Sequence, residues 1–145
     1  MDVISGFRST FNDLLKDRDE SVTLLSKELN TSPYVILKWK SRRVNLRAKS
    51  LIKLADHFDC SVEYLCGKTN EYLDYEPKLC PAFGERIVTV LNECGWSSYK
   101  LFKKTKISPA QYHHWRIGAE PLLSSLEEIA VHLGITLDYL LGRDR

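Results

Sequence analysis

The chain has 145 residues, of which 43% are hydrophobic and 28% are charged. Its 21 basic and 19 acidic side chains leave a formal net charge of +2, so it is neither a polybasic tail nor an acidic solvating segment. This composition excludes collagen and low-complexity disorder. No apolar run is long enough to span a bilayer, and the N-terminus lacks the features of a secretory signal. We therefore expect a cytoplasmic protein with one ordinary domain or two very small ones.

The cysteines do not indicate a metal site. Cys60, Cys66, Cys80 and Cys94 form no C-x-x-C pair, and a zinc set with His57 would have irregular spacing. A disulfide framework is not expected in a chain without a secretory signal. We expect reduced thiols, no metal, no cofactor and no small-molecule ligand.

The chain contains an internal repeat, which is sought first because a missed repeat leads to the wrong fold. A shift of 76 residues aligns residues 7–39 with residues 83–115, and a shift of 75 aligns residues 50–67 with residues 125–142. The matched pairs include Phe7/Phe83, Leu25/Leu101, Ser32/Ser108, Trp39/Trp115, His57/His132, Tyr64/Tyr139 and Gly67/Gly142. The one-residue slip falls where a loop would absorb it.

The repeat predicts two small domains, residues 1–67 and residues 83–145, joined by a linker of residues 68–82. The linker contains two prolines but also aromatic and apolar residues. These are Pro77, Pro81, Tyr72, Leu73, Tyr75 and Leu79. Because a free tether would have fewer aromatic residues, we expect the linker to pack partly against one or both domains.

Apolar residues at helical spacing predict five short helices in the first repeat. The inward residues of the first four are Phe7, Phe11, Leu14, Leu15, Leu25, Leu29, Ile36, Trp39, Leu51, Leu54, Ala55 and Phe58. Ser21 opens the second helix. Ser32 and Pro33 open the third, where the missing amide proton of proline costs nothing. A fifth helix runs from Ser61 and ends before Gly67.

The second repeat has the same pattern. Its inward residues are Phe83, Ile87, Val90, Leu91, Leu101, Tyr112, Trp115, Leu126, Ile129, Ala130 and Leu133. Ser108 and Pro109 open its third helix, and Ser124 with Glu127 predicts a capping box for the fourth. No alternating strand pattern occurs. The predicted fold class is all-α, with two tandem five-helix domains.

Both repeats end in closely similar segments, SVEYLCG at 61–67 and ITLDYLLG at 135–142, preceded by LADHF at 54–58 and IAVHLG at 129–134. Each repeat also has two helices joined by a tight turn. In these features both repeats resemble the lambda-repressor-like (Cro/XRE-type) helix-turn-helix family, and together they cover nearly the whole chain.

The resemblance implies a sequence-specific regulator of transcription, repressor-like, that binds double-stranded DNA. Its recognition helices would be residues 33–41 and 109–117, lying in the major groove. The expected base contacts are Pro33, Tyr34, Val35, Leu37 and Lys38 in the first repeat and Gln111, His113 and His114 in the second. For Val35 and Leu37, contact with thymine methyl groups and burial in the core both remain open.

A basic segment follows the first recognition helix. Residues 38–53 hold seven basic side chains and no acid. By the resemblance this loop lies beside the DNA backbone, where phosphates must be neutralised. The expected phosphate contacts are Ser21, Ser32, Lys40, Arg42, Arg43, Arg47 and Lys49, together with Ser97, Lys100, Ser108 and Arg116 from the second repeat.

The second repeat departs further from the family pattern. Phe102 replaces the small residue that Ser26 supplies inside the second helix, and it would push two closely crossing helices apart or turn outward. Lys106 replaces Asn30 in the turn and suits a left-handed conformation poorly. We therefore expect the second repeat to bind DNA more weakly or to serve as a partner surface.

Two arrangements on DNA remain open. The 15-residue linker would reach roughly 50 Å when extended, which exceeds the roughly 34–36 Å between successive major-groove faces, so one chain could cover two half-sites. Alternatively, two chains form a homodimer through their second domains. The competing function is a protein-interaction module, such as an anti-repressor or an antitoxin, with weak or no DNA binding. No catalytic motif indicates an enzyme.

Overall fold

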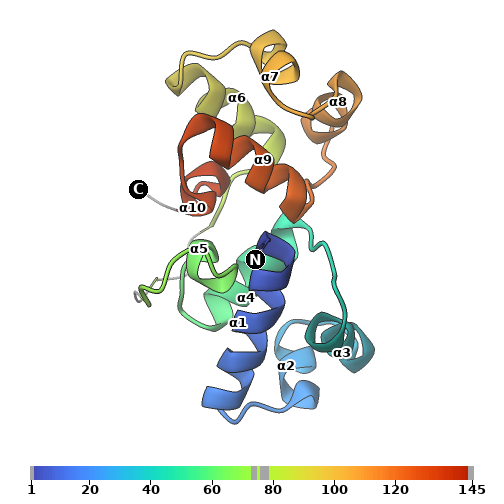
Figure 1. The fold of residues 1–145 in the computed structure, drawn as a ribbon. Coiled ribbons are helices and arrows are strands. Elements are labelled where there is room, and N and C mark those ends of the chain that lie inside the picture. Colours follow the sequence, from blue (N-terminus) through green and yellow to red (C-terminus); the bar gives the residue numbers. More distant parts are fainter. Residues whose placement is uncertain (1, 73–74, 76–78, 144–145) are drawn as a thin grey trace. The chain divides into compact units, whose positions relative to one another are not determined.

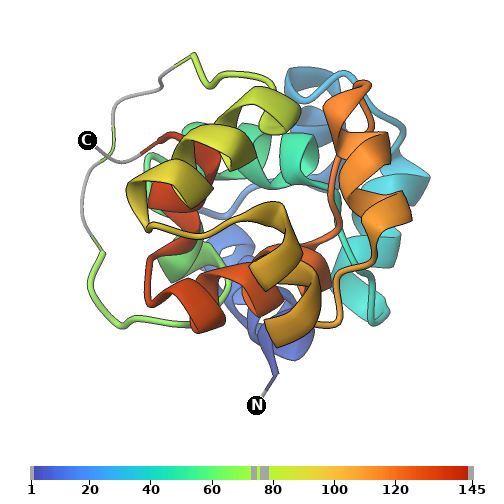
Figure 2. The ribbon, with the colours of Figure 1, turned by 90° about the horizontal axis from the view of Figure 1, so that it is seen from above.

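The computed structural model describes residues 2–72, 75 and 79–143. Close contacts divide the chain into two compact units, residues 1–46 with 50–77, and residues 47–49 with 78–145. All regular elements of the described residues are helices (Figures 1 and 2). The all-helical prediction is therefore confirmed for the part of the chain that is described.

The described part of the chain forms ten helices. They are α1 (Val3–Asp17), α2 (Val22–Glu28), α3 (Pro33–Ser41), α4 (Ala48–His57), α5 (Val62–Leu65), α6 (Phe83–Glu93), α7 (Ser98–Lys104), α8 (Pro109–Arg116), α9 (Leu123–Leu133) and α10 (Leu137–Leu141). Serine or threonine hydroxyls accept from backbone N–H groups at the starts of α2, α3, α5, α7, α8 and α10. Such caps satisfy amide groups that have no partner within the helix.

The first unit has an aromatic core around α1. The Phe11 ring lies edge-on to Trp39 of α3 and to Phe58 after α4, with ring centroids 6.1 and 6.2 Å apart. All the inward residues predicted for this repeat are buried. Burial of each Leu or Phe side chain contributes roughly 1.5–3 kcal/mol, so this stripe holds α1, α3 and α4 together.

The second unit has a comparable core. Trp115 is buried edge-on to Phe83, with ring centroids 5.3 Å apart. Phe83 itself and the predicted inward residues Tyr112 and Leu133 are only partly buried. After α10, Arg143 forms a buried ion pair with Asp138, with a 2.7 Å distance between Nη1 and Oδ1.

The predicted capping box of the fourth helix in the second repeat is wrong. α9 begins at Leu123 after Leu122, and no side chain caps it, so Ser124 already lies in the first turn. Starting the helix there places Leu123 and Leu126 on one buried stripe. The capping box occurs instead on α8, where Ser108 and Gln111 cap each other's backbone N–H groups.

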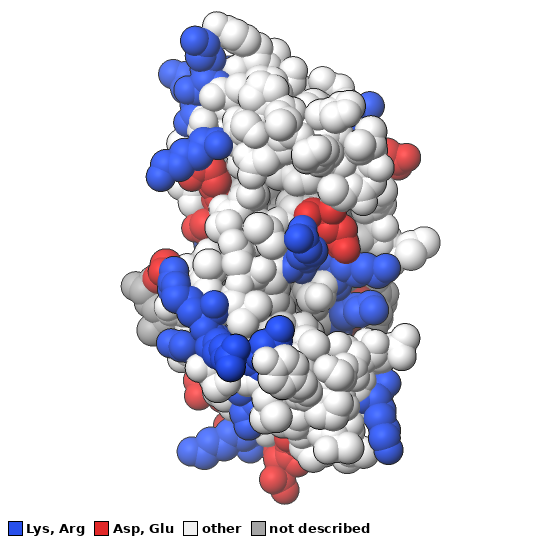
Figure 3. All heavy atoms as spheres, turned by 90° about the vertical axis from the view of Figure 1, so that its right-hand side faces the viewer, with Lys and Arg blue, Asp and Glu red and all other residues white. Residues whose placement is uncertain are grey.

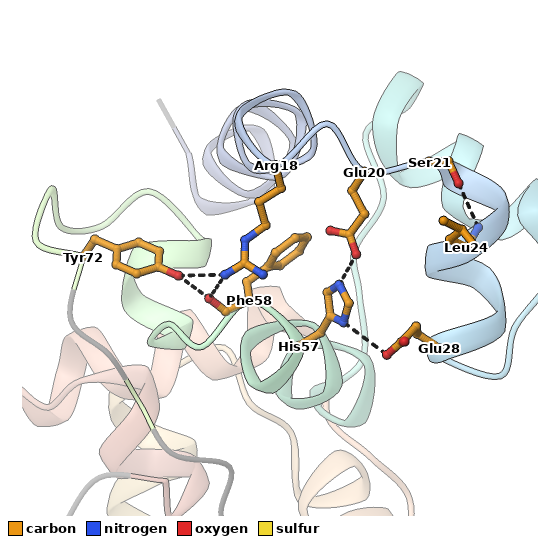
Figure 4. Close-up of polar contacts among 8 residues, drawn as sticks. All are labelled: Arg18, Glu20, Ser21, Leu24, Glu28, His57, Phe58 and Tyr72. Atoms are coloured by element: carbon orange, nitrogen blue, oxygen red, sulfur yellow. Dashed lines mark hydrogen bonds and ion pairs between the residues drawn. The ribbon is translucent and has the colours of Figure 1, made fainter.

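The start of the predicted linker packs against the first unit. The Tyr72 hydroxyl donates to the Phe58 carbonyl, which also accepts from Arg18 Nη2 at 2.8 Å (Figure 4). The Tyr72 ring lies edge-on to Tyr64, with ring centroids 5.1 Å apart. Leu73 and Pro77 lie outside the described residues, and Leu79 is exposed.

The backbones of α1 and of the residue after α5 approach each other closely in the first unit. A Cβ atom at Gly6 of α1 would lie 2.3 Å from the carbonyl oxygen of Cys66, which follows α5. Since that oxygen belongs to the backbone, it cannot move aside without shifting α5. Glycine is therefore required where α1 and α5 meet.

We predict that Gly6→Ala lowers the free energy of unfolding by about 1–3 kcal/mol, as overpacking does in other cores. Thermal unfolding followed by circular dichroism measures the change as a lower melting temperature of the first unit. Ser9→Ala, at an exposed position on the same helix, serves as the control and leaves it nearly unchanged. An unchanged melting temperature for Gly6→Ala would show that α1 and α5 do not meet as described.

Candidate nucleic-acid interface

A close crossing of α2 and α3 forms the centre of the candidate interface. Ser26 of α2 is buried, and its hydroxyl donates to the Thr23 carbonyl at 2.7 Å. This small residue lets α2 pack closely against α3. The turn between the helices passes through Asn30 in the left-handed conformation, with φ 54°. This is the role expected for Asn30, since asparagine adopts that conformation more readily than most residues.

Both ends of α3 are fixed by polar contacts. The Ser32 hydroxyl accepts from the Val35 N–H at 3.3 Å. At the other end, the Asn12 side chain of α1 donates to the Lys40 carbonyl and to the Arg8 carbonyl, both at 2.9 Å. The Asn12 contact therefore ties the C-terminal end of α3 to α1.

A histidine contact that sequence reasoning missed also positions α2. A hydrogen bond joins His57 Nε2 of α4 to Glu20 Oε1 just before α2, and His57 Nδ1 lies 3.7 Å from Glu28 Oε2 at the end of α2 (Figure 4). The two glutamates are far from His57 in sequence, and only the fold brings them together. The contact ties both ends of α2 to α4.

The outward side of α3 carries the residues predicted to contact bases. Tyr34 is 60% exposed and Leu37 is 50% exposed, so Leu37 is not a core residue. Pro33 is also exposed, and Val35 is half-buried. Lys38 Nζ lies over the Tyr34 ring, 5.2 Å from its centroid. The buried face of the helix is formed by Ile36 and Trp39.

Basic side chains, Lys38 of α3 among them, lie around this outward side. Figure 3 faces the side of the first unit that carries α3, and Lys and Arg predominate over Asp and Glu there. Arg42, the C-cap residue of α3, and Lys53 of α4 are exposed, while Lys38 and Lys40 are half-buried. A cationic rim around an exposed helix suits a polyanion such as the DNA backbone.

Arg43 is paired within the first unit. Its guanidinium Nη2 lies 2.6 Å from Asp2 Oδ2, and Nη1 donates to Asp2 Oδ1 and to the Ser5 hydroxyl, both at 2.8 Å. The hydrogen bonds from Arg43 and from the Ser5 N–H hold the pKa of the Asp2 carboxyl well below its ordinary value. The basic segment contains no acid, but folding brings one to it from the start of α1.

Residues 47–49 of the basic segment group with the second compact unit. There the Lys49 N–H donates to the Glu120 carboxylate at 2.7 Å, and Arg47 Nη1 donates to the Glu120 carbonyl at 3.1 Å. The cationic rim of the first unit is therefore defined by Lys38, Lys40, Arg42, Arg43 and Lys53, and we keep this name for it.

The corresponding helix pair of the second unit is built differently. α7 ends at Lys104, and Thr105 continues in an extended conformation with no left-handed residue in the turn. The Phe102 ring of α7 meets the Tyr112 ring of α8 edge-on, with centroids 5.7 Å apart. α7 and α8 are not among the closely packed helix pairs, whereas α2 and α3 are. Phe102 is half-buried, and a side chain of its size fits the looser packing of α7 against α8.

Two of the predicted contact residues on α8 have intramolecular partners. Gln111 Oε1 accepts from the Ser108 N–H at 2.9 Å within the capping box. Arg116 Nη1 donates to the Gly84 carbonyl at 2.7 Å. His113 and His114 are exposed, with ring centroids 6.2 Å apart. The predicted Ser97 caps α7 through its hydroxyl, which accepts from the Lys100 N–H at 3.1 Å.

Comparison with known protein families agrees with the geometry of the first helix pair. Residues 10–67 match the family model of the Cro/C1-type HTH DNA-binding domain. The match extends from within α1 to Gly67 after α5 and supports the Cro/XRE helix-turn-helix family for this segment. That family model describes a DNA-binding domain. The matched residues do not include the second repeat.

No curated protein and no solved structure matches the chain. Among the described residues, no helix has both the length and the apolar character needed to cross a membrane.

We predict that Arg43→Gln raises the pKa of Asp2 toward the ordinary carboxyl value of about 3.9, because the variant loses the guanidinium that stabilises the carboxylate. Titration of the Asp2 carboxyl carbon by NMR measures this shift. Since the folded-state pKa lies below the unfolded-state value, the contact stabilises the fold above about pH 4. That stabilisation is lost as the pH falls toward the lowered folded-state pKa. An Asp2 titration identical in the two proteins would rule out the contact.

Proposed function

We propose that the chain is a sequence-specific transcription regulator, repressor-like, that binds double-stranded DNA through the first unit. α3 enters the major groove, and the cationic rim contacts the phosphates on either side. The observation that carries this proposal is the exposure of Tyr34 and Leu37 on α3, a helix whose opposite face is buried. The family match of residues 10–67 supports it.

Each group in the proposed interface has a chemical role. Tyr34 donates from its hydroxyl to a base or a phosphate, and Lys38 contacts guanine or a phosphate. Leu37 and the half-buried Val35 pack against thymine methyl groups. Arg42 neutralises phosphate, together with Lys40, while the Ser21 and Ser32 hydroxyls donate to phosphates beside the helix starts.

A second candidate function, protein interaction, is favoured by exposed apolar side chains on α2 and α3. Leu24 and Leu37 are 61% and 50% exposed, and such residues also suit an apolar partner surface. Salt dependence separates the two functions, because phosphate contacts release counterions and apolar contacts do not.

We predict that Arg42→Gln weakens duplex binding and reduces the slope of log affinity against log salt by about 0.9, the value for one phosphate contact. The loss is equal for a selected site and a random duplex, since a phosphate contact carries no sequence information. Fluorescence anisotropy across a salt series measures both quantities. Lys16→Gln, which removes an exposed charge from α1, is the matched control. If Arg42→Gln and Lys16→Gln changed the duplex affinity and the salt slope equally, the cationic rim would not lie in the DNA interface.

We predict the opposite effect for Asp2→Asn. This change frees the Arg43 guanidinium for a phosphate, so duplex affinity rises and the salt slope steepens by up to about 0.9. Asp13→Asn, which removes an exposed carboxylate elsewhere on α1, serves as the control for the change in net charge. If Asp2→Asn and Asp13→Asn raised the duplex affinity equally, the gain would come from net charge and not from a phosphate contact by Arg43.

A further inference from the structure

In the second unit, α7 carries a concentrated positive face. The predicted recognition helix, α8, does not. Lys100, Lys103 and Lys104 stand at i, i+3 and i+4, which places them on one side of the helix. All three side chains are exposed, and residues 96–108 contain no acid. We name these three residues the α7 lysine face.

Two of the three lysines of the α7 lysine face lie over aromatic rings. Lys100 Nζ lies 4.7 Å from the Trp96 ring centroid, and Lys103 Nζ lies 5.4 Å from the Tyr99 ring centroid. Tyr99 is 65% exposed. Each cation–π contact already restricts the lysine side chain in the free protein. The side chain therefore loses less conformational entropy when it binds a ligand.

No carboxylate neutralises these lysines within the described part of the second unit. The carboxylate of Glu128 in α9 accepts the Lys106 backbone N–H at 3.0 Å, and among the described residues no carboxylate forms an ion pair with any of the three lysines. Like charges at i and i+4 repel each other in a helix. An anionic ligand relieves that repulsion, and the face therefore suits a polyanion.

α8 is poorly suited to reading bases, by contrast. The Gln111 carbonyl is used in the capping box, the Arg116 guanidinium is held by Gly84, and Phe102 keeps α8 from packing closely on α7. A bidentate contact with adenine needs both polar atoms of a Gln side chain, so it would require the capping box to open.

We infer that the second unit binds the phosphate backbone of duplex DNA through the α7 lysine face, without sequence preference. This inference rests on the proposed function and assigns the two units different roles. The first unit selects the sequence, and the second adds affinity that is equal for all sequences. Single-stranded nucleic acid, which could stack on the Tyr99 ring, is the competing ligand.

The test compares Lys100→Gln/Lys103→Gln with the matched control Lys16→Gln/Lys68→Gln in the full chain, with all four lysines exposed in the parent. The probes are a selected duplex, a random-sequence duplex and a single strand. We expect the α7 variant to lower the salt slope by about 0.9 per lysine and to lose the same factor of affinity on both duplexes. The melting temperature of the α7 variant stays unchanged or rises, because the variant loses repulsion between neighbouring lysines.

A second variant, His113→Ala/His114→Ala, tests α8 directly. We expect the ranking of selected sites to stay unchanged. A changed ranking would overturn the inference, as would an α7 variant that behaves like its control or loses affinity for the single strand alone. If the α7 variant loses duplex affinity while Arg42→Gln and Tyr34→Ala change nothing, the proposed function of the first unit fails. The division of roles then fails with it, and only the phosphate contact by the α7 lysine face stands.

Discussion

The close packing of α2 against α3 is the constraint on which the candidate interface depends. Ser26 leaves room for the crossing, and Asn30 turns the chain sharply enough to start α3 after a few residues. With Ile36 and Trp39 buried on one side, Tyr34 and Leu37 are forced outward. The exposure of Tyr34 and Leu37 on α3 is therefore a direct consequence of core packing.

The second unit shows what happens when that constraint is relaxed. Phe102 replaces the small residue, the turn contains no left-handed residue, and α7 and α8 meet through aromatic edges. The cores of the two repeats remain alike, with a buried tryptophan at the equivalent position in each. The two units therefore share a buried tryptophan and differ in the packing of the helix pair that would carry recognition.

Sequence alone predicted the helices and the core of the first unit because helical periodicity and serine caps are local signals. In the second unit, the predicted inward residues Phe83, Tyr112 and Leu133 are only partly buried. Sequence reasoning placed α3 correctly at residues 33–41 and anticipated the effects of Asn30 and Phe102. It failed at Ser124, where burial of Leu123 outweighed a good capping pattern. It also missed the pairing of Asp2 with Arg43 and of Glu20 with His57, because these partners lie 41 and 37 residues apart and only tertiary folding joins them.

The central claim is that the outward side of α3 lies against duplex DNA. The most direct measurement is an NMR titration of the full chain with a selected duplex, following backbone amide signals and the methyl groups of Val35 and Leu37. The account predicts that the largest shifts fall on Tyr34, Leu37 and Lys38 and persist at raised salt with a selected site. Shifts confined to other helices, with α3 unperturbed, would contradict it.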